Sequence, residues 1–137
     1  MGLKEKKAAR EFQEQRLDDL VSRAHKAAKF EFEFDIDWDS ISVDNFSHLY
    51  DQTWSLIYFE PLINAMEELC DDKFYQEAIA EDMKKVVIHN VGDLSKASAH
   101  ASYSEGTLTL NHSPIYNADN QINDRKEAIK EAIEKAL

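Results

Sequence analysis

The chain has 137 residues, of which 43% are apolar and 31% are charged, and its formal net charge is −11. This length predicts one domain over residues 1–137, and the apolar content is high enough to exclude a disordered chain. The single cysteine excludes an internal disulfide, and no apolar run reaches the ~18 residues of a membrane span. We therefore expect a cytoplasmic protein.

The negative charge is concentrated in the middle of the chain. Residues 1–29 carry eight Lys/Arg and five acids, whereas residues 31–82 carry fifteen acids and only Lys73 as a base. Residues 83–137 carry seven of each sign. A concentration of anions repels nucleic acids and anionic lipids and attracts basic surfaces. We therefore expect no direct nucleic-acid binding and no membrane binding, although acidic side chains also serve solubility alone.

The first segment favours a long helix. Neither Gly nor Pro occurs between Leu3 and Ala28, and apolar residues recur at spacings of three and four from Leu17 onward. Residues 1–11 carry little apolar surface, so we expect them to form a frayed or projecting helical arm. One possible use of this helix is homodimerisation, as a structural subunit.

The next segment shows the clearest pattern in the chain. From Phe30 to Asp39, apolar residues alternate with acids. Such alternation predicts an extended strand with the apolar side chains on one face and the carboxylates on the other. We expect the apolar face to belong to the core and the acidic face to meet water.

The middle of the chain is mainly helical in pattern. Residues 44–59 favour a helix, although residues 54–59 are also compatible with a short strand. Pro61 fits the first turn of a new helix, because its missing N–H is not needed there. A further helix follows the pair Asp71 and Asp72, and the β-branched run from Val86 to Asn90 predicts a second strand.

The last third of the chain predicts a hairpin and a helix. Residues 99–112 alternate on both sides of Glu105 and Gly106, which predicts a two-residue turn with Ser104 facing Thr107. In this register His100 and His112 lie on opposite faces of the sheet. After a polar loop, Asp124 and Glu127 predict a capping box at the start of the last helix.

Together these elements predict a two-layer α+β domain. We expect the order α-β-α-α-β-β-β-α and a three- to four-stranded, mostly antiparallel sheet with helices on one face. The strand order does not follow from the sequence.

No local motif predicts catalysis, a cofactor or a metal site. The spacing of Asp35, Asp37 and Asp39 matches the start of a calcium loop, but Ser40 and Phe46 stand where that loop needs Gly and Glu. The five histidines include no pair at HxH or HxxxH spacing. A small enzyme or ligand-binding domain remains an alternative, in which His48, His89 or His100 lies beside an acid in a pocket.

The functional prediction is based on the acidic side chains of the predicted strand. Glu31, Glu33, Asp35 and Asp37 repeat at about 7 Å along an extended chain, a spacing similar to that of phosphates on a nucleic-acid strand. Such a row can occupy a basic groove of a partner protein through contacts to Lys and Arg. The sequence therefore favours a noncatalytic acidic interaction domain, with an inhibitor, immunity protein or antitoxin as the example of such a role. Protection of a sheet edge would also explain these charges.

Overall fold

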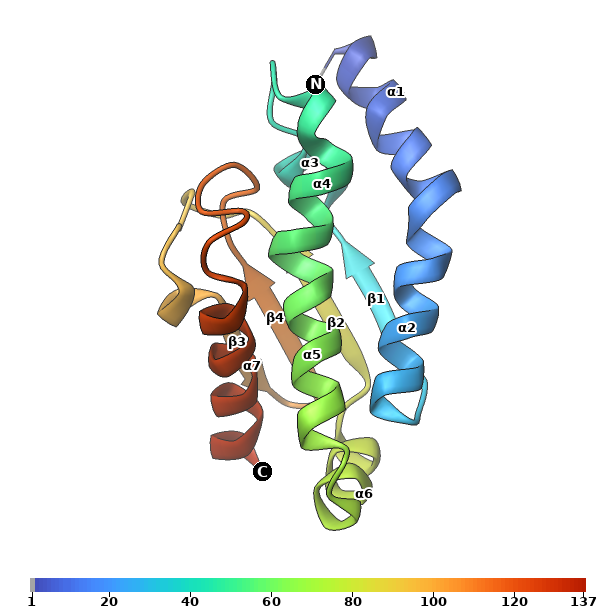
Figure 1. Cartoon of the computed structure of the whole chain (residues 1–137), viewed down its shortest axis with the longest axis vertical. Helices are drawn as coiled ribbons and strands as arrows, with labels where there is room; N and C mark the ends of the chain where they lie inside the picture. The colour runs from blue at the N-terminus through green and yellow to red at the C-terminus, as the bar shows by residue number, and fades with distance from the viewer. Residues whose placement is uncertain (1) are drawn as a thin grey trace.

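A computed structural model describes residues 2–137, and its centre is a four-stranded open sheet (Figure 1). The strands are β1 (Glu33–Ile36), β2 (Lys85–His89), β3 (Ala101–Ser104) and β4 (Thr107–Asn111), in the spatial order β1-β2-β4-β3. β1 and β4 both run parallel to β2, and only β3 and β4 are antiparallel. The α+β class is confirmed, but the expectation of a mostly antiparallel sheet is wrong.

The long connections explain the mixed sheet. Residues 37–84 lie between β1 and β2 and are mainly helical, so they return the chain to the end of the sheet where β1 begins. The second strand can then run parallel to the first. Only the two-residue turn between β3 and β4 enforces an antiparallel pair.

Helices precede, separate and follow the strands, and the predicted order is matched in part, because α3 adds a helical segment between β1 and β2. α1 (Leu3–Phe12), the π-helical turn η1 (Gln13–Leu17) and α2 (Asp18–Ala28) form one long helix. After β1 come α3 (Trp38–Ile41), η2 (Ser47–Leu49), α4 (Tyr50–Trp54), the π-helical turn η3 (Ser55–Phe59), α5 (Glu60–Leu69) and α6 (Lys73–Asp82). η4 (Ala97–Ala99) precedes β3, and α7 (Ile122–Ala136) follows β4. Figure 1 shows α2, α5 and α7 side by side over the same face of the sheet.

Alternation along the strands divides the sheet into a covered and an open face. Val86 and Ile88 of β2, with Leu108 and Leu110 of β4, are completely buried, and the residues between them are only partly buried. The buried side chains join one apolar core that includes residues of α2, α5 and α7. The sheet therefore has one face in the core and one face toward solvent.

The N-terminal segment is regular helix from Leu3. Glu5 and Ala9 are buried, and α1 contacts η2 and α4. Leu3 itself is 86% exposed. The segment for which the sequence predicts a frayed or projecting arm is thus a regular helix that packs against η2 and α4. Met1 lies outside the described residues.

The ambiguous segment 54–59 is helical. Residues 55–59 form the π-helical turn η3, which continues from α4 and leads directly into α5. Pro61 lies in the first turn of α5, as expected, although this helix does not start separately from the one before it.

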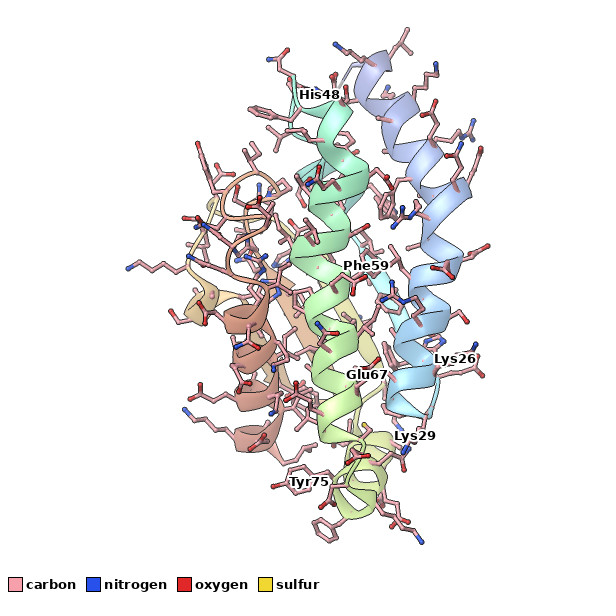
Figure 2. The ribbon with its side chains drawn as sticks, in the orientation of Figure 1. Lys26, Lys29, His48, Phe59, Glu67 and Tyr75 are labelled. Atoms are coloured by element: carbon pink, nitrogen blue, oxygen red, sulfur yellow. The ribbon has the colours of Figure 1, made fainter. Side chains whose placement is uncertain are left out.

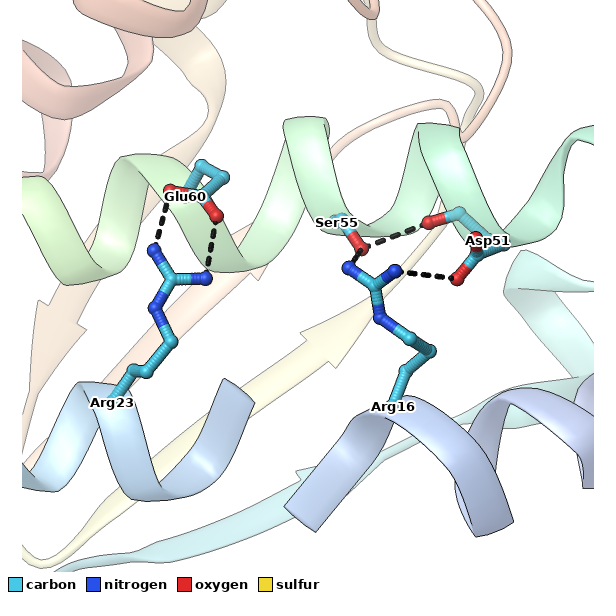
Figure 3. A network of polar contacts seen from close by, with 5 residues as sticks. All are labelled: Arg16, Arg23, Asp51, Ser55 and Glu60. Carbon is cyan, nitrogen blue, oxygen red and sulfur yellow. Dashed lines mark hydrogen bonds and ion pairs between the residues drawn. The ribbon is translucent and has the colours of Figure 1, made fainter. Parts of the chain in front are cut away.

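Two arginines of the long first helix bind the α4–α5 helix (Figure 3). Arg23 makes two hydrogen bonds to the Glu60 carboxylate, at 2.8 and 3.1 Å. About two helical turns before Arg23, Arg16 lies 3.4 Å from the Asp51 carboxylate and donates to Ser55. Two-point contacts of this kind fix how the neighbouring helices lie against each other.

The C-terminal hairpin has the predicted register. Ser104 faces Thr107, and both Glu105 and Gly106 have positive φ, at 51° and 76°, as a type I′ turn requires. The predicted capping box is wrong, because α7 begins at Ile122 and Asp124 lies inside its first turn. Gln121 precedes the helix and makes no side-chain cap.

Candidate functional site

The four predicted partner-binding residues form an exposed acidic row at one edge of the sheet. Glu31, Glu33, Asp35 and Asp37, called the acidic row below, are all exposed. The side chains between them point the other way, since Phe32 is buried and Phe34 packs against the core. The predicted alternation between core and solvent is therefore present from Glu31 to Asp37.

The extended segment is shorter than predicted. Only Glu33–Ile36 form β1, and residues 38–41 form the short helix α3. Asp37 caps this helix, because its carboxylate accepts a hydrogen bond from the Ser40 N–H at 3.3 Å. The expectation of a strand reaching Asp39 is wrong for this reason: aspartate at a strand end favours capping over continued pairing.

The outer edge of β1 has no neighbouring strand within residues 2–137. The N–H of Glu33 donates to Lys84 O at 3.0 Å and the N–H of Asp37 donates to Ile88 O at 2.9 Å. Alternate residues of a parallel strand bond to opposite sides, so the main-chain groups of Phe34 and Ile36 point to the outer edge. The acidic row lies beside this edge.

The charge of the acidic row is not neutralised within the described chain. None of its four carboxylates forms an ion pair with a residue in 2–137. Lys85 stands opposite Glu33 in the register of β1 and β2, yet it makes no ion pair with that side chain. The row therefore presents uncompensated negative charge to solvent, where it attracts cations over about one Debye length.

The three histidines considered for a pocket lie in three different environments. His48 lies in η2, exposed near one end of the helical layer (Figure 2). His89 is partly buried at the end of β2, and His100 is completely buried. In the described part of the chain none of the three forms an ion pair with a carboxylate.

The structure instead pairs His100 with His112. Their ring centroids are 5.4 Å apart, and both side chains are completely buried. The prediction that they lie on opposite faces is wrong, because the turn η4 ends at Ala99 and His100 keeps a helical backbone, so the strand alternation starts only at Ala101. Neither ring nitrogen of His100, nor Nε2 of His112, has a hydrogen-bond partner in the described chain.

A buried arginine and a buried tyrosine complete this polar cluster. Tyr58 donates its hydroxyl hydrogen to the main-chain oxygen of His112 at 2.6 Å. Arg125 is completely buried and donates to Asn117 O at 2.8 Å and Ala118 O at 2.9 Å. Its guanidinium thus holds the loop between β4 and α7, with main-chain oxygens as its acceptors.

The third acceptor of Arg125 is created by the π-helical turn. The N–H of Glu60 bonds to Ser55 O, five residues back, and the following residue, Pro61, has no N–H. Leu56 O is therefore left without its usual helical donor, and Arg125 Nη2 donates to it at 3.3 Å. The sequence analysis missed Arg125, although its spacing of four from Ile129 and of eight from Ile133 places it on the buried stripe of α7.

The cluster is an environment that disfavours positive charge. Burial lowers the pKa of His100, and the neighbouring His112 and Arg125 lower it further. Burial likewise lowers the pKa of His112 and raises that of Tyr58. Both imidazoles are therefore neutral near pH 7, and the cluster offers no carboxylate to act with them as an acid–base pair.

The described chain contains no group of three or more His, Cys, Asp or Glu placed to hold a metal ion. Cys70 is buried, and this burial raises the pKa of its thiol to about 11, which keeps it in the unreactive protonated form at neutral pH. Of the residues described, the exposed acidic row is thus the strongest candidate for a functional site.

Comparisons with known proteins do not assign a family. No family model, no curated protein and no solved structure matches this chain. Over residues 2–137, none of the helices combines the length and apolar character needed to cross a membrane.

Proposed function

We propose that this protein is a noncatalytic acidic interaction domain that binds a basic protein surface through the acidic row. The observation that supports the proposal is the exposure of all four carboxylates along the free edge of β1, without ion-pair partners in residues 2–137. A strand holds alternate side chains about 7 Å apart, so Lys and Arg side chains of a groove can meet them one by one. Each contact orients the partner and speeds encounter.

The most suitable partner is a protein that binds nucleic acid. Its groove is already built to receive a row of phosphates, and an acidic row of similar spacing would occupy it in place of the nucleic acid. This is the action of an inhibitor, immunity protein or antitoxin. The cluster of His100, His112 and Arg125 does not favour the enzyme alternative, because it is closed to solvent and has no acid.

Affinity capture from a native lysate tests this proposal. The bait variant Glu31→Gln, Glu33→Gln, Asp35→Asn, Asp37→Asn removes the charge of the row, and Asn keeps the cap at position 37. A control variant carries Gln or Asn at the exposed acids Glu11, Glu14, Asp18 and Asp19, which removes the same charge from another surface.

We expect the wild-type and control baits to capture the same basic protein at low salt. High salt should release it, and the row variant should fail to capture it. Equal capture by the row variant, or capture that is independent of salt, would show that these carboxylates serve only solubility or edge protection.

A further inference from the structure

β1 is an outermost strand of the sheet, and its outer edge is open in the described part of the chain (Figure 1). The N–H groups of Glu33 and Asp37 donate inward, toward β2. The main-chain groups of Phe34 and Ile36 point the other way, as alternate residues of a parallel strand do. No side chain within residues 2–137 forms a hydrogen bond with these outward-facing groups.

The residue before this stretch shows how the same edge is closed elsewhere. Phe32 lies two residues before Phe34 on the same face, with their rings 5.3 Å apart. His25 Nε2 lies 3.3 Å from the main-chain nitrogen of Phe32 and 3.0 Å from its oxygen. An imidazole of α2 thus binds the main chain at Phe32. The open edge begins after it and follows β1, where the N–H and C=O groups of Phe34 and Ile36 remain for another strand.

The two faces beside this edge indicate which strand would fit there. An added strand lies about 4.8 Å from its neighbour, so its side chains on the solvent face would contact the acidic row. On the other face Phe34 and Ile36 are only partly buried, although both pack against the core. A strand in which basic and apolar residues alternate would place its bases beside the carboxylates and cover these two apolar side chains.

The carboxylates of the acidic row also discriminate between strands. A charged edge resists pairing with most sequences, and like charges directly opposite each other destabilise a strand pair. A second copy of β1 would place acid against acid, so this chain is a poor occupant of its own edge. A strand rich in Lys or Arg is favoured by the same charges, which have no ion-pair partner within residues 2–137.

We propose that the basic partner adds an extended strand to the outer edge of β1, which rests on the proposed function and names the form of the basic surface. Main-chain hydrogen bonds to Phe34 and Ile36 hold this strand in register. Its Lys or Arg residues contact the acidic row, and the apolar residues between them lie beside Phe34 and Ile36. The hydrogen bonds provide affinity, and the alternating side chains provide specificity.

Fluorescence anisotropy with labelled peptides tests the main-chain contacts separately from the charge. The probe alternates Lys and Val over about seven residues, the length of an ordinary strand. Two further peptides carry N-methyl groups, on the Lys residues in one and on the Val residues in the other, so that their charge is unchanged. The N–H groups of alternate residues point to opposite edges, so only one of these peptides loses the edge that faces β1.

We expect the unmodified peptide and one N-methylated peptide to bind with similar affinity. The other N-methylated peptide should bind at least about tenfold more weakly, because two or more hydrogen bonds to β1 are lost. Loss with the methylated Lys residues would indicate a strand parallel to β1, and loss with the methylated Val residues an antiparallel one.

A variant of the protein tests the same edge from the other side. Ile36→Pro removes an outward N–H and keeps the N–H groups that bind β2, a position where an edge strand tolerates proline. We expect it to weaken binding of the unmodified peptide by roughly fivefold. Ile36→Val keeps the N–H and should bind as the wild type does. The comparison of the two N-methylated peptides does not depend on the folding of the proline variant.

Equal affinities of the two N-methylated peptides, or no binding of the unmodified peptide, would overturn strand addition. If the two N-methylated peptides bind equally and the row variant of the protein binds none of the peptides, the acidic row acts through charge alone and the proposed function stands. If the row variant binds the peptides as well as the wild type does, the proposed function fails as well.

Discussion

Arg125 Nη2 donates to the main-chain oxygen of Leu56 at 3.3 Å, across 69 positions of sequence. The same guanidinium binds Asn117 O and Ala118 O, so one buried side chain connects α7, the loop before it and the π-helical turn η3. Arg125 is buried without a carboxylate partner, because three main-chain carbonyl oxygens accept hydrogen bonds from its guanidinium. This arrangement indicates a structural role for the side chain.

The first prediction concerns this side chain. Arg125→Met keeps the apolar stem but leaves three buried oxygens without a donor, so we expect the free energy of unfolding to fall by about 3 kcal/mol. Denaturation in urea measures the loss, with Arg10→Met at an exposed ion pair as the control. A loss no larger than that of the control would mean that Arg125 does not hold the loop.

The second prediction concerns pH. Burial lowers the pKa of His100 and of His112, so in mildly acidic solution the unfolded chain binds protons that the folded chain does not. Stability is therefore complete above the ordinary histidine pKa of about 6.5 and falls as the pH drops below it. Each imidazole contributes up to about 1.4 kcal/mol per pH unit.

His100→Leu separates this effect from the titration of carboxylates. Neither imidazole nitrogen of His100 has a hydrogen-bond partner in the described chain, so an apolar replacement should leave stability at pH 7 unchanged or raise it. Urea midpoints measured from pH 7.5 down to about pH 5 should then decline less steeply than in the wild type. An unchanged slope would show that His100 is accessible to protons in the folded state.

The third prediction concerns the hairpin turn. Glu105 and Gly106 both have positive φ, and a Cβ on Gly106 would lie 2.8 Å from Asp82 O. Glu105→Asn should stabilise the fold by about 0.5 kcal/mol, because Asn tolerates this conformation better. Gly106→Ala should destabilise it by more than about 1 kcal/mol. Thermal unfolding compares the two variants, and shifts of the same sign would contradict the type I′ turn.

Local patterns predicted the local structure well. Alternation and a turn glycine were enough to give the register of β3 and β4, because these strands are adjacent in sequence. The alternation of Phe and acidic residues likewise predicted the exposed acidic row, although the cap at Asp37 ends β1 early. Such features depend on residues a few positions apart.

Features that depend on distant contacts were not predictable. The parallel pairing of β1 and β4 with β2 is set by how the helices pack, which no local pattern records. The His100–His112 contact depends on where β3 begins, one residue after His100. The acceptor for Arg125 depends on a π-helical turn that the sequence does not mark except by Pro61.

Hydrogen–deuterium exchange on the captured complex tests the acidic row most directly. If the row is the interface, binding should slow exchange of main-chain amides in residues 31–37, because Phe34 and Ile36 lie on the free edge beside the row. Exchange over residues 101–104 of β3, at the opposite edge of the sheet, should stay unchanged. Slower exchange elsewhere, with residues 31–37 unaffected, would contradict the proposed interface.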